Sequence, residues 1–256
     1  MKLNFKKSGS GDPLLILHGL FGSLDNWATL AKKLAEKYTV YLIDQRNHGH
    51  SPHADEFNYE VMSDDLSELI KNESLNKVNI IGHSMGGKTA MLYATLNPDK
   101  VNKLIVVDIA PKEYPVTHDD IIKALQSVDL KNITERNEAD AQLQKKIDDE
   151  STRQFLLKSL YRKNNSESKF AWKFNLEAIS NHIENVGEAL PQNAIFDGDT
   201  LFINGANSDY ITKKDYDLIH YHFPNSKIVT IKNAGHWVHA EQPEELFKTV
   251  TEFIDS

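Results

Sequence analysis

One segment of the sequence has the residues and the order expected around a catalytic serine. It reads NIIGHSMGG over residues 79–87 and contains Gly-x-Ser-x-Gly with Ser84 at its centre. The residues 78–81 predict a strand and the residues 88–96 predict a helix, the context in which a sharp turn exposes such a serine. A turn that only packs tightly or holds a phosphate is the alternative. The order of strand, motif and helix favours a nucleophile.

A serine hydroxyl is a weak nucleophile until a base takes its proton. His236 is the best candidate for that base, because its segment NAGHW follows a predicted strand over residues 228–231. Folds of this kind build their sites from loops at the carboxyl ends of strands. His239 is better explained as a packing or hydrogen-bonding residue. We therefore expect His236 to approach Ser84 in the folded chain.

A carboxylate is needed to orient the imidazole and to stabilise its charged form, and two aspartates fit the chain order. Asp108 directly follows the predicted strand 104–107, and Asp209 lies in the polar segment NSDY after the predicted strand 201–203. A carboxylate that closes an apolar strand needs a buried partner. Asp209, in contrast, is easily explained as a turn residue. We favour Asp108 and keep Asp209 as the alternative acid.

Two backbone N–H groups are expected to stabilise the oxyanion that forms when a serine attacks a carbonyl. The turn directs the N–H of Met85, at the start of the predicted helix, toward the reacting centre. The second donor should come from the segment HGLFG over residues 18–22, where we favour Leu20 and keep Phe21 as the alternative. His18 is expected to support this loop by hydrogen bonding.

Short apolar runs alternate with stretches of helical periodicity along most of the chain. The runs cover residues 14–17, 38–43, 78–81, 104–107, 201–203 and 228–231, and a closing helix is expected over 243–253. This alternation predicts an α/β fold with a mostly parallel sheet flanked by helices, formed by residues 1–110 and 199–256. Residues 111–198 show helical periodicity and no convincing strand. We expect them to form a helical lid, inserted after the strand that ends at Asp108.

The composition excludes several other kinds of site. The 256-residue chain has a net charge of -8, which disfavours a nucleic-acid partner, and it has no cysteine, which excludes disulfides and thiolate chemistry. No apolar run approaches the length of a membrane span, so we expect a soluble, cytoplasmic protein. One group of polar residues could suggest a metal site but matches no metal-binding motif: Asp44, His48, His50, His53 and Asp55.

With these residues in place, the chain resembles α/β-hydrolase esterases of the bacterial YbfF type and their mitochondrial relatives, the abhydrolase-domain-containing 11 proteins. The likeness covers nearly the whole length and rests on HGLFGS at 18–23, DQRNHG at 44–49, GHSMGGK at 82–88, VDIAP at 107–111 and GHWVHA at 235–240. It implies a serine esterase that acts on acyl esters, with acyl-CoA thioesters as a further substrate class, and that needs no metal or organic cofactor, with Asp108 as the acid. It also implies that Ser208 lies beside the histidine. Asp209 stands where these relatives often have proline, which leaves the choice of acid open.

Other activities are compatible with the same fold. A similar triad serves carbon–carbon bond hydrolysis, lyase reactions and perhydrolysis, and the fold can also form a non-catalytic small-molecule receptor. Acyl-CoA thioesters are a further substrate class, because basic residues of the insertion could attract phosphates: Lys145, Lys146, Arg153, Lys158, Arg162 and Lys163. Acidic residues at 148–150 interrupt that run, so a solvated helix face explains it as well. The expected partner is a small-molecule ester or thioester, and the sequence does not determine the oligomeric state.

Overall fold

A mostly parallel sheet is the centre of the computed structural model, which describes residues 1–115, 118–163 and 170–256. Among these residues the sheet has seven strands in the order β1-β3-β2-β4-β5-β8-β9. They are β1 Phe5–Ser8, β2 Pro13–Leu17, β3 Thr39–Ile43, β4 Val78–His83, β5 Val101–Val107, β8 Thr200–Gly205 and β9 Ser226–Ile231. Only β1 runs antiparallel to its neighbour, β3. The predicted parallel sheet is confirmed, and β1 is an additional edge strand that the sequence analysis did not predict.

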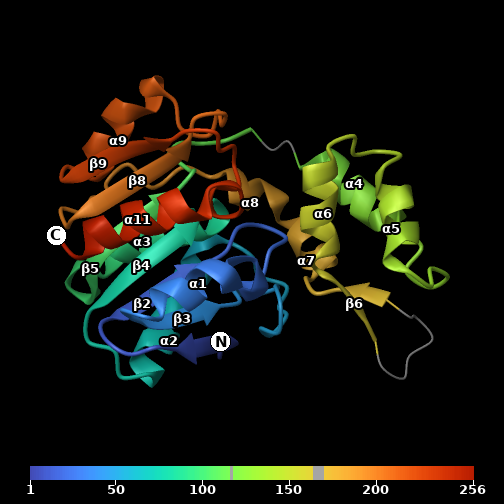
Figure 1. Ribbon diagram of the computed structural model, residues 1–256, viewed down its shortest axis with the longest axis horizontal. Helices are drawn as coiled ribbons and strands as arrows, with labels where there is room; N and C mark the ends of the chain where they lie inside the picture. The colour runs from blue at the N-terminus through green and yellow to red at the C-terminus, as the bar shows by residue number, and fades with distance from the viewer. Residues whose placement is uncertain (116–117, 164–169) are drawn as a thin grey trace.

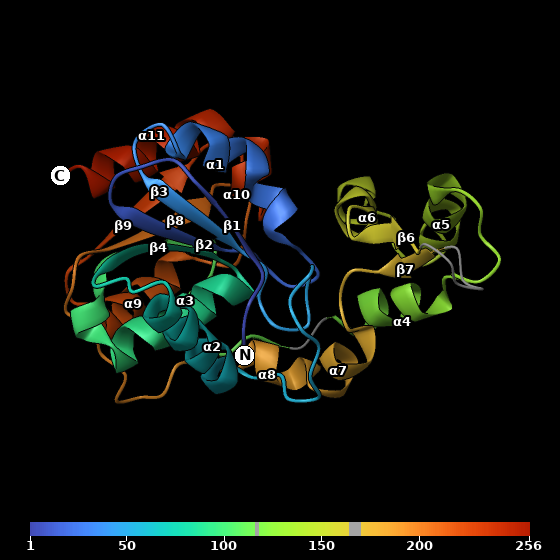
Figure 2. The same ribbon diagram turned by 90° about the horizontal axis from the view of Figure 1, so that it is seen from below.

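Helices cover both faces of this sheet (Figures 1 and 2). One face carries α1 Ala28–Leu34, α10 Val238–Glu241 and α11 Pro243–Ile254, and the other carries α2 Tyr59–Asn72, α3 Met85–Leu96 and α9 Tyr216–His222. Short 3-10 helices join these elements: η1 Leu24–Trp27, η2 Pro98–Lys100 and η3 Lys213–Asp215. Because both faces are covered, β4 is buried along its whole length, which explains the apolar residues Val78, Ile80 and Ile81 within it. No helix in the described ranges has the length and apolarity to cross a membrane.

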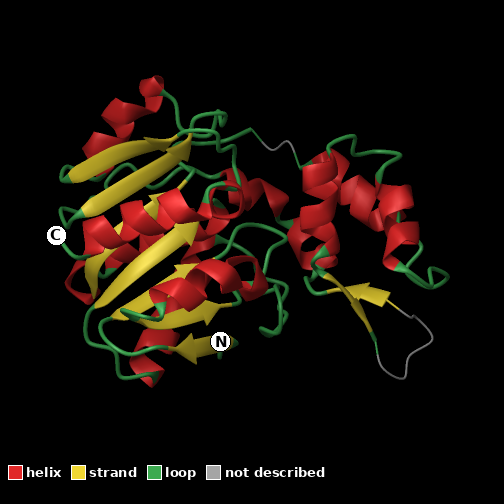
Figure 3. Ribbon diagram, in the orientation of Figure 1, coloured by secondary structure: helices red, strands yellow, loops and turns green. Residues whose placement is uncertain are grey.

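The insertion between β5 and β8 lies beyond the carboxyl-terminal ends of the parallel strands (Figure 1). It contains α4 Asp119–Ser127, α5 Arg136–Leu143, α6 Glu150–Leu157, α7 Leu176–Asn181 and α8 Ile183–Gly187. It also contains two short antiparallel strands, β6 Leu160–Arg162 and β7 Phe170–Trp172 (Figure 3). The expectation that this region has no strand was therefore wrong. Strands of three residues are too short to show the alternating pattern on which the sequence analysis relied.

The carboxyl ends of the parallel strands point toward the insertion (Figure 3). The apolar core of the insertion, which includes Leu125, Leu143 and Leu156, is continuous with Leu20 and Met85 of the sheet domain. Loops that leave the strands at this edge are consequently enclosed between the sheet and the insertion. This is where the predicted site residues should meet.

Candidate active site

Ser84 occupies the turn between β4 and α3, with a φ of 52° and a ψ of -119°. This conformation is unfavourable for a residue with a side chain, and the surrounding packing must hold it. A Cβ on Gly82 would lie 2.3 Å from the Gly86 carbonyl oxygen, and one on Gly86 would lie 2.5 Å from the Leu17 carbonyl oxygen. Glycine is therefore required on both sides of the serine. The turn leaves Ser84 half-buried at the wall of a cavity.

His236 and Asp108 meet at this edge of the sheet although 128 residues separate them in the sequence. The Nδ1–H group of His236 donates to Asp108 Oδ2 at 2.7 Å. Asp108 is fully buried, and its other oxygen, Oδ1, accepts the Gly205 N–H at 3.1 Å. The hydroxyl of Ser208 donates to Oδ2 as well. With Nδ1 donating to the carboxylate, the remaining nitrogen of the imidazole, Nε2, can accept a proton.

The structure places Asp209 differently from Asp108. Asp209 is exposed, and within the described part of the chain no hydrogen bond or ion pair joins it to His236. It lies on the wall of a cavity next to Tyr210. Its carboxylate therefore does not orient the imidazole in this structure.

Ser84 faces two small cavities. One, of about 240 Å³, is also lined by His236 and by apolar residues of the loops and the insertion: Leu20, Phe21, Ile121, Phe155, Leu156 and Trp237. The other, of about 210 Å³, does not include His236 and is lined in part by Tyr59, Ile109, Tyr114, Val186 and Tyr210. His118 and Leu20 border both cavities. Ser84 and His236 thus share one cavity, and a ligand at Ser84 can extend in two directions.

The loop after β2 lies against the nucleophile turn. A Cβ on Gly19 would be 3.3 Å from Ser84 Cβ. The Phe21 N–H donates to Nε2 of His48 at 3.1 Å, so it is not available to a ligand. Within the described ranges the N–H groups of Leu20 and Met85 donate to no protein acceptor. The geometry therefore favours Leu20 over Phe21 as the second oxyanion donor.

Two buried histidines beside His236 are neutral. The Nε2–H of His83 donates to the His236 carbonyl oxygen at 2.8 Å, and burial together with His236 and His239 holds the pKa of His83 well below its usual range. Burial and His236 lower the pKa of His239 to about 3, and its ring stacks on Trp27 with centroids 4.6 Å apart. The expectation of a packing role for His239 is confirmed. Of these three histidines, His236 is the one whose side chain contacts the Asp108 carboxylate.

Polar residues between positions 44 and 55 form hydrogen bonds and an ion pair that stabilise the fold. The Asp44 carboxylate accepts hydrogen bonds from Asn4 Nδ2, from the Leu24 N–H and from the His50 N–H, at 2.7 to 2.9 Å. Arg46 and Asp65 form a buried ion pair, with Arg46 Nε 2.6 Å from Asp65 Oδ2. No group of three or more metal-ligating side chains gathers among the described residues. These residues fix the loop that carries His48.

Sequence reasoning did not identify three residues that line the site. Tyr210 stacks on the imidazole of His236, Trp237 stacks on Phe155 of the insertion, and His118 borders both cavities. Tyr210 and Trp237 lie in the segments NSDY and GHWVHA, which the sequence analysis quoted without giving either residue a role. His118 lies in the insertion, where no motif pointed to it.

The order of the sheet and the turn at Ser84 place the protein in the α/β-hydrolase class. Residues 12–243 match the family model described as alpha/beta hydrolase fold, and the chain belongs to this family. It is 34% identical to Esterase YbfF of Escherichia coli, over 100% of both chains. It is 39% identical to the zebrafish (Danio rerio) protein named sn-1-specific diacylglycerol lipase ABHD11, over 98% of this chain and 80% of that one. The resemblance predicted from the motifs is confirmed.

A solved structure is similar over the same length. The structure titled Marine microorganism esterase has a TM-score of 0.95 and 48% sequence identity, and the match covers 98% of this chain and 99% of that one. The family and these relatives together identify the protein as a carboxylic ester hydrolase.

Proposed function

We propose that the protein is a serine esterase in which Ser84 is the nucleophile, His236 the base and Asp108 the acid. The observation that carries this proposal is the 2.7 Å contact between His236 Nδ1 and Asp108 Oδ2, made by an imidazole that shares a cavity with Ser84. The carboxylate fixes the imidazole tautomer and stabilises its protonated form. Ser208 and Gly205 hold the carboxylate in turn.

The reaction proceeds in two stages. Ser84 Oγ attacks the acyl carbonyl carbon while His236 Nε2 takes the hydroxyl proton, and the N–H groups of Leu20 and Met85 bind the resulting oxyanion. The intermediate collapses, His236 passes the proton to the leaving alcohol, and an acyl-enzyme remains. Water then attacks the acyl group by the same route and releases the acid and Ser84.

Each of the two cavities can hold one half of an ester, the alcohol in one and the acyl chain in the other. His236 must deliver a proton to the leaving oxygen, so the alcohol belongs in the cavity that His236 lines, beside Phe155 and Trp237. The acyl chain then occupies the cavity lined by Ile109 and Val186. At about 240 and 210 Å³ both cavities are smaller than a typical ligand pocket of about 300 Å³ or more. This supports small acyl and alcohol groups.

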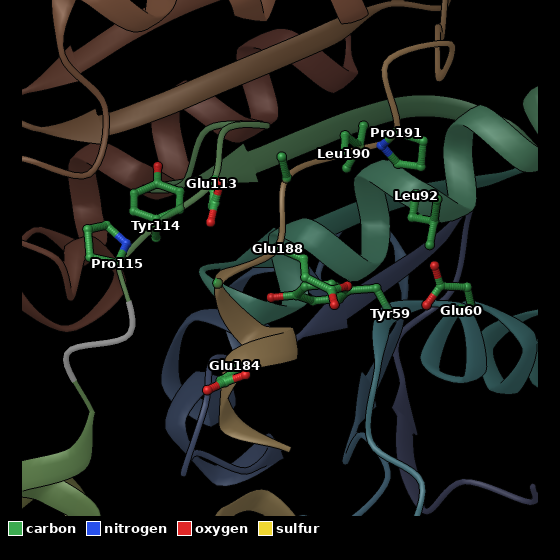
Figure 4. Close-up of a pocket in the computed structure, with 12 residues that line it drawn as sticks. Tyr59, Glu60, Leu92, Glu113, Tyr114, Pro115, Glu184, Glu188, Leu190 and Pro191 are labelled. Atoms are coloured by element: carbon green, nitrogen blue, oxygen red, sulfur yellow. The ribbon is translucent and has the colours of Figure 1, made fainter. Parts of the chain in front are cut away.

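Charge favours neutral esters over acyl-CoA thioesters. A third cavity, of about 530 Å³, adjoins the acyl cavity and shares Tyr59 and Tyr114 with it (Figure 4). Four acidic side chains line it: Glu60, Glu113, Glu184 and Glu188. These groups repel the phosphates of CoA.

Part of the basic run on the insertion is already paired. Arg153 is buried, with its Nε 2.8 Å from Asp140 Oδ1, and Arg162 donates to the Thr134 carbonyl oxygen. Arg153 is therefore a poor phosphate ligand, and Arg162 has already used one of its donors. Together with the acidic cavity, this supports uncharged acyl esters as substrates, with the segment 111–198 acting as the lid over them. The zebrafish relative is named as a lipase for diacylglycerol, which is also an uncharged ester but a larger one.

A labelling experiment tests the proposal. We expect a fluorophosphonate probe to label the wild-type chain and not the Ser84→Ala variant. We also expect the wild type to hydrolyse short-chain p-nitrophenyl esters, with acyl-CoA thioesters of the same chain length turned over more slowly. Labelling that persists in Ser84→Ala would mean that another residue is the nucleophile. A correctly folded wild type that is neither labelled nor active would indicate a non-catalytic receptor, and activity on substrates other than esters would indicate a different reaction of the same fold.

A further inference from the structure

The backbone of Phe21 has a conformation that its side chain does not favour. Residues 19–22 form a turn in which the Gly22 N–H donates to the Gly19 carbonyl oxygen at 3.0 Å. Phe21, at the third position of this turn, has a φ of 60°. Turns with a positive φ at that position usually carry glycine there. Other parts of the molecule must therefore hold Phe21, and Leu20 beside it carries the proposed oxyanion donor.

The sheet domain holds the N–H side of Phe21. His48 Nε2 accepts the Phe21 N–H at 3.1 Å, while His48 Nδ1–H donates to the Arg46 carbonyl oxygen at 2.9 Å. The second hydrogen bond fixes the tautomer in which Nε2 is an acceptor. His48 is fully buried, and burial together with the neighbouring His18 lowers its pKa to about 3. The ring is neutral at ordinary pH, so Nε2 keeps its lone pair and can accept the Phe21 N–H.

The insertion holds the carbonyl side. Ser159, in the turn between α6 and β6, donates its hydroxyl hydrogen to the Phe21 carbonyl oxygen at 2.8 Å across 138 residues of sequence. Ser159 is 1% exposed, so water does not compete for this bond. The Phe21 ring also packs against Phe174 of the insertion, with centroids 5.1 Å apart. Phe21 is thus fixed from both sides, and two of these three contacts come from the insertion.

We propose that Ser159 is a positioning residue for the oxyanion hole: its hydroxyl holds the Phe21 carbonyl and so keeps the Leu20 N–H directed at the bound carbonyl. This inference rests on the proposed function, because it requires Leu20 to bind the oxyanion. Without Ser159, the Phe21 carbonyl loses its hydrogen bond, and only His48 and Phe174 still restrain this strained residue. The turn that carries the Leu20 N–H is then less well fixed. The hole is then complete only while the insertion is seated on the sheet domain. A lid that opens disables the chemistry as well as the binding cavity.

The test separates binding from the chemical step. Ser159→Ala is expected to lower kcat for a short-chain p-nitrophenyl ester by about tenfold, less than the hundredfold or more lost with a direct oxyanion donor. The KM should change by less than about twofold. The inhibition constant of a trifluoromethyl ketone, whose adduct with Ser84 places an oxyanion in the hole, should rise by the same factor as kcat falls.

Two further variants make the result decisive. Ser159→Cys keeps nearly the same volume but offers only a weak S–H donor, so its kcat should lie between those of the wild type and Ser159→Ala. Ser127→Ala is the matched control: Ser127 Oγ also donates to a carbonyl oxygen of the insertion, that of Ala124 at 2.8 Å. Both residues belong to α4 and Ser127 is exposed, so the loss of this bond should leave kcat and the inhibition constant unchanged.

The possible outcomes are distinct. If folded Ser159→Ala and Ser159→Cys keep the wild-type kcat and ketone affinity while Ser84→Ala is inactive, the inference is overturned and the proposed function stands. A rise in KM at constant kcat also overturns it, because it indicates substrate binding rather than oxyanion positioning. If the wild type shows no Ser84-dependent ester turnover, the proposed function itself fails.

Discussion

Tyr210 lies nearly flat against the imidazole of His236, with ring centroids 3.9 Å apart and an angle of 19° between the ring planes. Its backbone carbonyl is held by the Tyr114 hydroxyl, which donates to it at 2.6 Å. Asp108 restrains the imidazole at Nδ1, and Tyr210 restrains the plane of the ring. Together they leave the imidazole little freedom to rotate away from Ser84.

We predict that Tyr210→Leu lowers kcat for ester hydrolysis by about three- to tenfold, because a stacked pair of this kind contributes about 0.5–1.5 kcal/mol. Tyr210→Phe keeps the stacked ring and should behave like the wild type. Steady-state kinetics on one short-chain ester measures both variants. Equal losses in the two would assign the effect to the phenol hydroxyl instead.

The choice of acid has a clear mutational test. Asp108→Asn should lower kcat by about 10³- to 10⁴-fold, because the amide no longer holds the imidazole in the reactive tautomer. Asp209→Asn should lie within about twofold of the wild type, since Asp209 is exposed and the hydrogen bond of His236 Nδ1 goes to Asp108 instead. Kinetics of the two isosteric variants, with thermal unfolding as a check on folding, provides the comparison. The opposite ranking would make Asp209 the acid.

The assignment of the alcohol cavity predicts a change in substrate preference. Phe155 of the insertion stacks on Trp237, with centroids 5.4 Å apart, beside His236. Phe155→Ala should raise kcat/KM for esters of bulky alcohols by about tenfold relative to methyl esters of the same acid, because it enlarges the alcohol cavity. The preference among acyl chains should not change.

Ile109→Ala is the matched variant in the other cavity. It should shift the preference toward longer acyl chains and leave the preference among alcohols unchanged. A panel of esters in which the acyl and alcohol parts vary separately measures both effects. If Phe155→Ala instead changes the preference among acyl chains and Ile109→Ala changes the preference among alcohols, the substrate binds in the reverse orientation.

A buried lysine predicts how stability depends on pH. The Nζ of Lys88, in α3, donates to the carbonyl oxygens of Lys112 and Glu188, which lie at the two ends of the insertion. Burial lowers the pKa of Lys88 from 10.5 to about 7. Between these values the unfolded chain binds more protons than the folded chain, so this group makes the free energy of unfolding increase with pH.

We predict that the wild type gains up to about 1.4 kcal/mol of stability per pH unit between pH 7 and 9 relative to Lys88→Met. Urea unfolding of both chains at several pH values measures the difference in slope. All other titrating groups are common to the two chains and cancel in that comparison. Parallel curves would mean that Lys88 keeps its charge in the folded protein.

Local patterns in the sequence were sufficient to predict most strands of the sheet. The strands β2, β4 and β5 are buried over most of their length, so each contains a short run rich in Val, Ile and Leu. The strand β1, with the sequence FKKS, is a mostly exposed edge and has no such run. The pair β6 and β7 is too short to show a periodicity. The sequence therefore did not predict β1, β6 or β7.

The sequence by itself determined Ser84 and its turn, because the glycines that permit the strained conformation are its near neighbours in the chain. It also reduced the base and the acid to a few candidates. Only the tertiary structure brought Asp108 to His236 and left Asp209 outside, because that contact joins segments 128 residues apart. The same holds for Leu20 and Phe21: their N–H groups are equivalent in sequence. His48, which lies 27 residues further along the chain, distinguishes them in the folded structure because it accepts the Phe21 N–H and not that of Leu20.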